Sequence, residues 1–423
     1  MRTEFFGDAE YLSAHPEIVK SSFFDFYKKR GFTIEENRPL TENTEFWRIF
    51  IVNSALVRFA PVFEWRENLG KPVCLCQECI KGVSDWVWRR EGFLTFFEQL
   101  GTGSQTHSQK EAITIFWEFF GSSLAMDRSR FLVTVYDGDS ESHQIWRELG
   151  FEDSQILPFG ERNYFSFAGG KVKGPVSALV YDRGPEYHQR FFGPTRKEDC
   201  HLDCECGRYS ELADIGFFTS TDGIFLIDTG IGLERLVAVL SGKDSVFQVG
   251  QLRNLGELIL NNCGLTTVSG KDKEIAIRIL ADHSRSIIAL FGEDICLSNK
   301  GVGYMFRKIF RRAILAGRRL GIKEPFLSKW LPGMIDLIKE ENPFFGQINA
   351  GIVGRAKLEE ESFFRTIQRG EKFFSKLCHD PLLSSEEALF LYDTYGLPPE
   401  LIRELVAERG WQIDTQAFET MFK

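Results

Sequence analysis

The segment from Ile227 to Arg235 carries residues suited to holding an anion at the end of a strand. It reads Ile-Asp-Thr-Gly-Ile-Gly-Leu-Glu-Arg, so an apolar stretch passes Gly230 and Gly232 before a helical pattern that carries Arg235. Glycines let a ligand approach the backbone, a helix N-terminus favours anions, and a guanidinium is a planar cation suited to phosphate. The segment therefore predicts a phosphate site. The alternative is a tight strand-to-helix turn in which Arg235 is an ordinary solvated helix residue.

Two groups of cysteines have spacings that can hold a metal ion. They are Cys74, Cys76 and Cys79 in the first group, and Cys200, Cys204 and Cys206, with the neighbouring His201, in the second. Thiolates at such spacing can ligate Zn²⁺, and one group could join the other across a sheet. Only Cys76 and Cys79 have the Cys-x₂-Cys spacing, and the usual pair of such motifs is missing. Small buried thiols and loop residues are therefore the alternative interpretation.

A strongly basic stretch runs from residue 300 to 323 without one acidic residue. Its cations are Lys300, Arg307, Lys308, Arg311, Arg312, Arg318, Arg319 and Lys323. The chain as a whole has 51 Lys and Arg against 60 Asp and Glu, a net charge of -9, which opposes long-range encounter with a polyanion. Any nucleic-acid site must therefore be local, and this stretch predicts one. A merely solvated basic face is the alternative.

The elements that would position these residues change in type along the chain. A helix is predicted for 16–31, and residues from about 45 to 240 are rich in short strands, such as 131–136, 176–181 and 223–228, with a helix at 110–122. Beyond about 245 the pattern is helical, at 246–263, 272–291, 303–321, 326–340, 354–378, 385–393 and 399–410. We therefore expect an α+β domain with a largely antiparallel sheet at residues 1–243, followed by an all-helical domain at 244–423.

Composition indicates an ordinary globular chain. Its 423 residues are 43% hydrophobic and 26% charged, which is unlike a disordered or membrane-embedded protein and long enough for two or three domains. No apolar run approaches the roughly 20 residues that span a bilayer, and the N-terminus lacks a signal-peptide pattern. We expect no membrane partner and a cytoplasmic protein with reduced thiols.

The segment Asp228-Thr229-Gly230-x-Gly232-Leu233-Glu234-Arg235 resembles motif 3 of class II aminoacyl-tRNA synthetases, in the form of the alanyl-tRNA synthetase family. The segment 95–101 resembles that family's motif 2 strand, and the segments 281–286, 298–299, 303–313 and 391–398 resemble its tRNA-recognition region. Similarity runs from about residue 16 to the end.

The resemblance implies a class II antiparallel sheet, flanked by helices, on which ATP and an amino acid react. The amino-acid carboxylate attacks the α-phosphorus, pyrophosphate leaves, and a hydroxyl at the tRNA 3′ end takes the acyl group. On that template Arg235 holds the ATP phosphates beside Gly230 and Gly232, and Phe96 stacks on adenine. Asp228 pairs with the α-ammonium, and Glu211 is a carboxylate for Mg²⁺. An ordinary surface strand residue is the alternative for Glu211.

For tRNA, the resemblance implies contacts to the acceptor stem. Asn299 and Asp393 match residues that read the minor groove, and Arg307, Arg311 and Arg312 would contact phosphates. Polar residues that flank helices are more often caps or turns, which is the alternative for Asn299 and Asp393.

Several residues depart from the family pattern. Lys81 stands at the motif 2 arginine, where it offers a point charge in place of a bidentate fork, and the loop that follows is short. Ala178 replaces an acidic residue, Ala213 a tryptophan, and Asp214 an asparagine, all where the amino-acid pocket is expected. Loss of a ring would enlarge that pocket, and an added carboxylate could select a substrate with a donor or a cation. The family's Cys/His knuckle is also absent.

We therefore expect an ATP-dependent aminoacyl-tRNA ligase of the alanine type, acting in translation and reduced to its catalytic and tRNA-recognition domains, without editing or C-terminal domains. One alternative is a paralogue that activates another small amino acid, for a tRNA or a metabolite. Another is a non-catalytic tRNA-binding module, against which the retained Asp228 and Arg235 argue.

Overall fold

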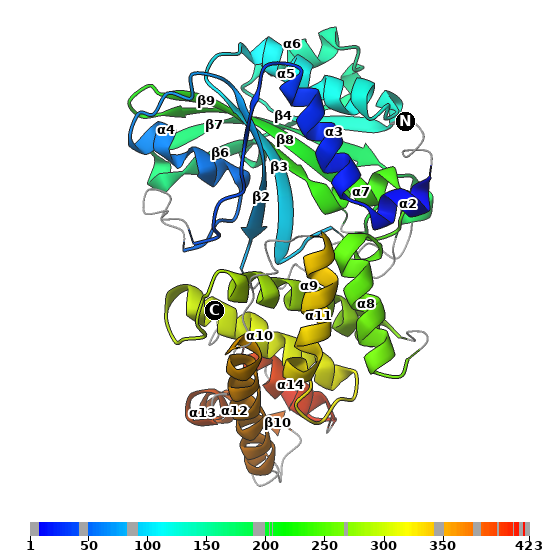
Figure 1. The fold of residues 1–423 in the computed structure, drawn as a ribbon, viewed down its shortest axis with the longest axis vertical. Coiled ribbons are helices and arrows are strands. Elements are labelled where there is room, and N and C mark those ends of the chain that lie inside the picture. The colour runs from blue at the N-terminus through cyan, green and yellow to red at the C-terminus, as the bar shows by residue number, and fades with distance from the viewer. Residues whose placement is uncertain are drawn as a thin grey trace.

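The fold comes from a computed structural model in which a sheet-containing half is stacked on a helical half (Figure 1). The structure describes residues 8–41, 50–82, 92–188, 199–202, 204, 206–265, 270–341, 351–374, 382–395, 397–408, 410–413 and 418. Most of the short loop expected after Lys81 lies outside these residues.

The first half is built on a sheet to which the described residues contribute nine strands. They are β1 (Thr33–Glu35), β2 (Val73–Ile80), β3 (Phe96–Ser104), β4 (Phe131–Tyr136), β5 (Ile156–Phe159), β6 (Tyr164–Phe167), β7 (Val172–Asp182), β8 (Tyr209–Ser220) and β9 (Phe225–Gly232). Their order is β1-β2-β3-β9-β8-β7-β4-β5, with β6 beside β7. The central pairs are antiparallel, whereas β1–β2 and β4–β5 at the two edges are parallel. The α+β class is confirmed, and the sheet is antiparallel except at those edges.

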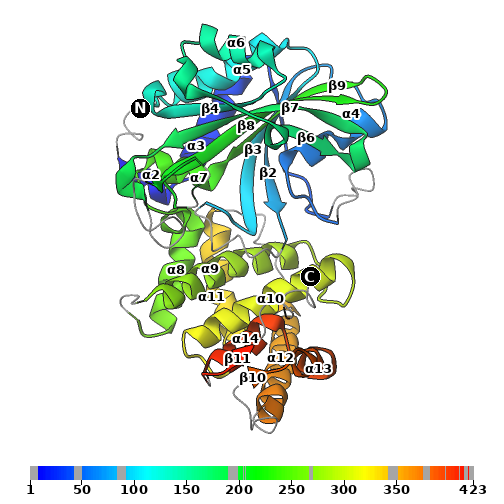
Figure 2. The same cartoon turned by 180° about the vertical axis from the view of Figure 1, so that it is seen from behind.

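One face of this sheet is covered by helices and forms an apolar core (Figures 1 and 2). The helices are α2 (Ala9–Ala14), α3 (Glu17–Lys28), α5 (Gln109–Glu118), α6 (Ser140–Glu148) and α7 (Leu233–Leu240). Large rings such as Phe23, Phe116 and Trp146 pack there with Leu100 and Ile231 from the strands. Among the described residues, nine buried phenylalanines lie in this core, of the 40 in the chain.

The other face carries a row of glycines across neighbouring strands. Gly101 lies opposite Gly230, and Gly103 lies opposite Asp228, in the β3–β9 pairing. A short 3₁₀ helix (Ala55–Phe59) that runs into α4 (Ala60–Glu64) covers part of this face, and Phe59 stands where a side chain at Gly103 would be. Towards β8 and α7 the glycine face carries the pocket that is treated below.

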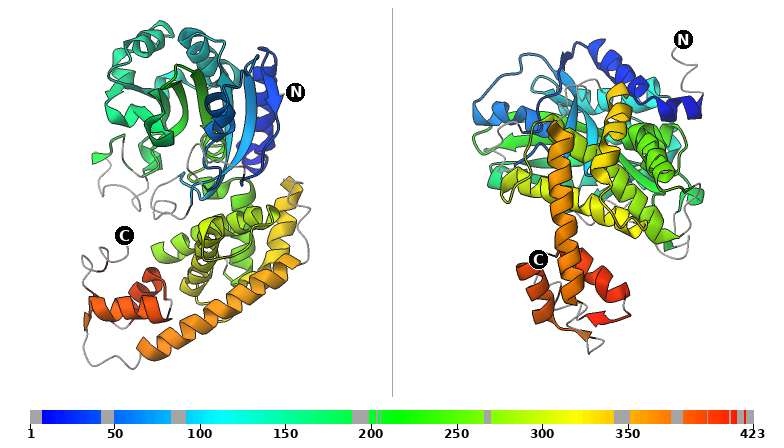
Figure 3. Two further views of the ribbon diagram at one scale, coloured as in Figure 1. Left: turned by 90° about the vertical axis from the view of Figure 1, so that its left-hand side faces the viewer. Right: turned by 60° about the horizontal axis from the view of Figure 1, so that its bottom comes forward.

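The second half is helical apart from one small addition. Its helices are α8 (Gly250–Asn262), α9 (Lys271–Gly292), α10 (Gly301–Arg319), α11 (Leu327–Glu341), α12 (Gly351–Phe374), α13 (Ser385–Tyr395) and α14 (Pro399–Glu408). The strands β10 (Leu382–Leu383) and β11 (Gln412–Ile413) form a short parallel pair, so the expectation of an all-helical domain was wrong in this detail. The long helix α12 runs from the sheet side of this half towards α13 and α14 (Figure 3). Among the described helices, none is both long and apolar enough to cross a membrane.

The two halves share buried contacts. The backbone N–H of Thr95, just before β3, donates to Asp282 Oδ1 of α9 over 2.9 Å, and Arg285 of α9 pairs with Glu234 of α7. Phe96 and Ile80 of the sheet belong to the core of the helical half. The boundary at residues 243 and 244 stays a prediction, and α9 is packed against both halves.

Candidate active site

One pocket on the glycine face collects most of the residues that the sequence assigns to ATP and the amino acid. Its lining includes Lys81 after β2, Phe97 and Gln99 of β3, Glu211, Ala213 and Asp214 of β8, Gly230 and Gly232 of β9, and Glu234 and Arg235 of α7. These residues come from segments far apart in the chain, and the sheet brings them together.

Strand register explains why glycine is needed at this pocket. Gly230 of β9 lies opposite Gly101 on one neighbouring strand and opposite Asp214 on the other. A Cβ atom at Gly230 would lie 2.2 Å from Nε2 of Gln99 and 2.9 Å from Oδ1 of Asp214. No side chain fits there without displacing one of these two groups.

Arg235 is held at the pocket by backbone carbonyls. It lies in the first turn of α7, its Nε donates to the Gly92 carbonyl over 2.9 Å, and its Nη1 donates to the Glu211 carbonyl over 2.6 Å. Its guanidinium carbon also lies 5.2 Å from the centre of the Phe93 ring. Because carbonyls leave the positive charge uncompensated, Arg235 keeps its attraction for an anionic ligand.

Lys81 supplies a second cation beside aromatic rings. Its Nζ atom lies 5.5 Å from the ring centre of Phe97 and 5.9 Å from that of Phe93. Burial and the Arg235 charge lower the pKa of Lys81, while Asp214 and Glu211 act in the opposite direction. A bound anion would favour the charged form of this amine.

Two carboxyl groups lie on the same face of the sheet. Burial and the charge of Glu211 raise the pKa of Asp214 to about 7. Asp228 lies opposite Gly216, two residues along β8 from Asp214, and does not line the pocket itself. Burial and the charge of Asp214 raise the pKa of Asp228 well above its ordinary value, and its buried Oδ1 has no hydrogen-bond partner among the described residues. Lys81 and Arg235 act to lower the pKa of Asp214, and a cationic ligand would do the same for Asp228.

The expectation for Phe96 was wrong. Its side chain is 1% exposed and packs in the helical core, with the Arg285 guanidinium 4.8 Å from its ring. Adjacent strand residues point to opposite faces, so Phe97 and not Phe96 lines the pocket.

The same alternation corrects the interpretation of Ala213. This residue borders the pocket, but it is paired with Leu179 and Ile231 and belongs with them to the helix-covered core. A smaller side chain at Ala213 therefore changes the core more than it enlarges the pocket. Ala178 is buried opposite Asp214 on the glycine face, but it does not line the pocket.

The first cysteine group does not form a metal site. Cys79 pairs with Phe97 and packs under the 3₁₀ helix, whereas Cys74 packs in the helix-covered core on the opposite face. Cys76 donates to Glu98 on that same opposite face, with a sulfur–oxygen distance of 3.8 Å. The three thiols are thus divided between the two faces of the sheet.

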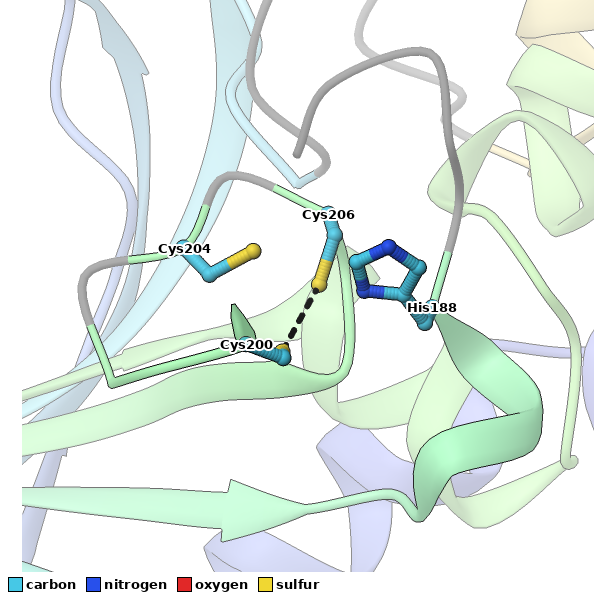
Figure 4. A group of neighbouring side chains, drawn as sticks. All are labelled: His188, Cys200, Cys204 and Cys206. Carbon is cyan, nitrogen blue, oxygen red and sulfur yellow. Dashed lines mark hydrogen bonds between the residues drawn. The ribbon is translucent and has the colours of Figure 1, made fainter. Parts of the chain in front are cut away.

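The second cysteine group does gather, and it gains a histidine. Cys200, Cys204 and Cys206 lie with His188, and one possible ligand atom from each lies within 4.8 Å of all the others (Figure 4). His188 was missed from the sequence because it precedes Cys200 by twelve residues, outside any compact metal motif. His201, which the sequence placed beside this group, is not part of the cluster.

The basic stretch is less free than its sequence indicates. Glu359 of α12 accepts from Arg311 Nε over 2.9 Å and lies 3.3 Å from Arg307 Nε, and Glu371 pairs with Arg318. Arg312 is 7% exposed, so the expectation that it contacts phosphate was wrong. Lys300 and Lys308 are exposed, as are the two candidate stem-reading residues, Asn299 before α10 and Asp393 on α13. Asn299 also accepts a hydrogen bond from Arg307.

Comparison with known proteins covers nearly the whole chain. Residues 18–423 match the profile of tRNA synthetases class II (A). The alanine–tRNA ligase of Caldicellulosiruptor saccharolyticus is 31% identical over 98% of this chain and 48% of the relative, and that of Petrotoga mobilis is 32% identical over 95% and 47%. The chain thus spans about half the length of the curated relatives it matches.

Solved structures add little to the sequence matches. A pyrrolysyl tRNA synthetase of Desulfitobacterium hafniense matches 55% of this chain and 71% of its own, with 11% identity and a TM-score of 0.31, too low to support an argument. The sequence matches confirm the resemblance inferred from motif 3 and its neighbours. This chain belongs to the class II (A) family of tRNA synthetases, with the alanine–tRNA ligases as its relatives.

Proposed function

We propose that this chain activates an amino acid with ATP and transfers it to the 3′ end of a tRNA, with alanine as the first candidate. The observation that carries the proposal is the pocket in which Arg235 and Lys81 face Asp214 over the glycines of β9. Cations for phosphates and a carboxylate for an ammonium are both needed to bring ATP and an amino acid together.

The chemistry that we propose depends on positioning and charge. The amino-acid carboxylate attacks the α-phosphorus, a bond to phosphorus forms, and the bond to pyrophosphate breaks. Arg235 and Lys81 would stabilise negative charge on the phosphates, and Phe97 takes the adenine role first expected of Phe96. Asp228, supported by Asp214, would hold the α-ammonium.

Mg²⁺ fits the residues that are present. The Glu211 side chain is exposed at the pocket, and Arg235 takes its backbone carbonyl and leaves the carboxylate accessible. Mg²⁺ is typically bound by one or two carboxylates together with substrate phosphates, and it neutralises phosphate charge. Glu211 is therefore the residue proposed to hold it.

A second candidate differs in the amino acid. Asp214 and Asp228 together bring two carboxyl groups to one binding region, whereas an α-ammonium neutralises only one negative charge. A substrate with an additional donor or cation on a small side chain would use the second group, and its acceptor could be a tRNA or a metabolite.

Exchange of pyrophosphate into ATP, measured with each of the twenty amino acids, tests the proposal. Exchange with alanine alone supports the first candidate, exchange with another amino acid the second, and none a non-catalytic tRNA-binding module. Arg235→Ala should lower exchange about 10²- to 10³-fold, the usual effect of removing one charge-stabilising donor. The matched control is Arg253→Ala, since Arg253 pairs with Glu10 and Glu257 away from the pocket.

For tRNA we propose a role of the helical half, residues 244–423, beside a catalytic half at 1–243, in a cytoplasmic enzyme. Asn299 and Asp393 would read the acceptor stem, and Arg307 and Arg311 would contact phosphates. Substitution of Asn299 and Asp393 by alanine should weaken tRNA charging while amino-acid activation persists. Unchanged charging in both variants would contradict the acceptor-stem role.

A further inference from the structure

The His188, Cys200, Cys204 and Cys206 cluster lies at the base of the connection between two neighbouring strands. The connection leaves β7 at Asp182 and enters β8 at Tyr209, and these two residues are paired in the sheet. His188 follows the first end of the connection and the three cysteines precede the second end. The paired strand ends therefore bring together ligands from both sides of a long connection.

An ion pair fixes the strand ends directly beside the cluster. Nε and Nη2 of Arg208 donate to the two carboxylate oxygens of Asp182 over 2.8 and 2.7 Å, and the Arg208 carbonyl accepts from the Arg183 N–H over 2.9 Å. Bidentate pairs of this kind have defined geometry. The direction in which Cys206 leaves the sheet is thereby set.

Local backbone hydrogen bonds also help to hold the cysteine side chains of the cluster close together. The N–H of Cys204 donates to the His201 carbonyl over 2.8 Å, which makes a tight turn between Cys200 and Cys204. The N–H of Arg208 donates to Cys206 Sγ over 3.5 Å, an outer contact of the kind that supports metal-bound ligands. His188, Cys204 and Cys206 are 6%, 7% and 0% exposed, so this is not a chance cluster of surface groups.

We propose that His188, Cys200, Cys204 and Cys206 bind one Zn²⁺ ion. Three sulfurs and one imidazole nitrogen form one of the usual sets for a closed, four-coordinate structural zinc site. Tetrahedral zinc with bonds of about 2.3 Å holds its sulfurs about 3.8 Å apart. The Cys200 and Cys206 sulfurs are 3.5 Å apart and the whole set lies within 4.8 Å, so small side-chain movements complete the geometry.

The zinc ion would hold one wall of a second cavity. Cys204 and Gly207 line this cavity together with Arg235 and Glu211, which also line the pocket of the proposed active site. None of the four ligands lines that active-site pocket itself, so the ion has a structural role. A metal that closes a long connection stabilises the folded chain by restricting the unfolded one.

Metal content of the purified full chain, produced with zinc in the medium, is the direct test. Mass spectrometry of the metals should find about one zinc per chain, and His188→Ala and Cys204→Ser should bring this close to background. His201→Ala is the matched control, because His201 neighbours Cys200 in sequence but lies outside the cluster. Cys76→Ser controls for the other cysteine group. Equal zinc in His188→Ala and His201→Ala would overturn the proposal.

Two further measurements keep the test decisive if a variant folds poorly. Zinc removed from the wild-type chain by a chelator should lower the melting temperature, and Zn²⁺ but not Mg²⁺ should restore it. Co²⁺ in place of zinc should give the sulfur charge-transfer and d–d absorption of a tetrahedral site. A metal-free chain with unchanged melting, or a Cys200–Cys206 disulfide in peptides of the native protein, would contradict zinc binding. Neither measurement depends on synthetase activity.

Discussion

At the scale of single residues, Asp214 has the most unusual environment in the pocket. Its carboxyl interacts with the cations Lys81 and Arg235 and with the acid Glu211, its charge acts on Asp228, and burial favours its neutral form. Its pKa of about 7 lies near neutrality. A small change of pH or a bound cation therefore changes the charge of this side chain.

We predict that Asp214→Asn changes the pH dependence of stability. The folded chain holds a proton on Asp214 up to about pH 7, whereas the unfolded chain loses it near the ordinary aspartate pKa of about 3.9. Stability contributed by this proton is present at low pH and is lost as pH rises through 7. Urea unfolding should show Asp214→Asn gaining more stability over the wild type at pH 8 than at pH 5, because at pH 5 only part of the loss has occurred.

The control for this prediction is Asp127→Asn. Hydrogen bonds from Ser129 lower the pKa of Asp127, so it does not titrate between pH 5 and 8. The slope of stability with pH in that range should match the wild type. An identical slope in Asp214→Asn would show that this carboxyl titrates in its ordinary range.

The residue types in the pocket could be predicted from the sequence. Which face of the sheet an individual strand residue points to could not. Two phenylalanines are adjacent in β3, and the sequence alone does not say which one faces the pocket. The pairing of β3 with β2 and β9 decides which alternate residues face each side of the sheet. It places Phe97 at the pocket and Phe96 in the core. Ala213 was misjudged for the same reason, because its orientation follows from its pairing with Ile231.

At the scale of elements, β9 combines a pocket floor with the start of α7. The strand ends at Gly232, which caps the helix, and Arg235 follows in the first turn. Arg235 follows Gly232 by only three residues, so the local backbone fixes the distance between the glycines of β9 and the Arg235 guanidinium.

Gly230→Ala should lower stability and, on the proposed function, amino-acid binding. The added Cβ overlaps Gln99 Nε2, and relief requires movement of Gln99 or Asp214. Overpacking of this kind costs about 1–3 kcal/mol. Gly256→Ala in α8 is the matched control, because nothing lies within 4 Å of its Cβ position. That change should stabilise by up to about 1 kcal/mol through helix propensity. Equal stability of the two variants would contradict the close packing at Gly230.

Most elements could be predicted from periodicity, whereas contacts between elements could not. The helix expected at 272–291 is α9 at Lys271–Gly292, and the strand expected at 131–136 is β4. In contrast, the glutamates that pair with α10 lie on α12, some 50 residues later in the chain. The charges along one helix do not reveal which acidic side chains of a neighbouring helix will pair with them.

At the scale of the whole molecule, a buried network of charges joins the helical half to α7. Arg285 of α9 pairs with Glu234 and donates to the Phe96 carbonyl over 2.8 Å. Glu234 also accepts from the Glu98 N–H over 3.1 Å, and Glu98 pairs with Lys20 of α3. Glu234 directly precedes Arg235 in the chain. The ion pair between α9 and Glu234 therefore also helps to position Arg235 at the pocket.

We predict that Arg285→Met destabilises the chain by about 3–5 kcal/mol, because it leaves Glu234 buried without its cation. The double variant with Glu234→Gln should recover part of that loss, and urea unfolding measures both. Lys339→Ala, which breaks an exposed pair with Asp336, should cost at most about 1 kcal/mol. Similar losses in Arg285→Met and Lys339→Ala would rule out a buried junction.

On the proposed tRNA role of the helical half, removal of a glutamate from α12 should strengthen tRNA binding. Glu359→Gln releases Arg307 and Arg311 from their ion pairs, and each cation that then meets a phosphate adds salt-dependent affinity. Binding measured between low and physiological salt should become tighter and steeper with salt. Glu361→Gln on the same helix is the control, since Glu361 faces Lys357 across 3.9 Å and not α10. Weaker binding in Glu359→Gln would contradict a phosphate role for these arginines.

The pairing of α12 with α10 also bears on discrimination among nucleic acids. Glu359 and Glu371 of α12 form ion pairs with arginines of α10. A phosphate that binds these arginines must first displace the carboxylates. A polyanion that offers only phosphate charge gains little binding free energy, because each phosphate replaces a carboxylate that was already paired with the arginine. If the helical half binds tRNA as proposed, a stem whose shape also engages exposed groups such as Asn299 should be bound in preference to other RNA.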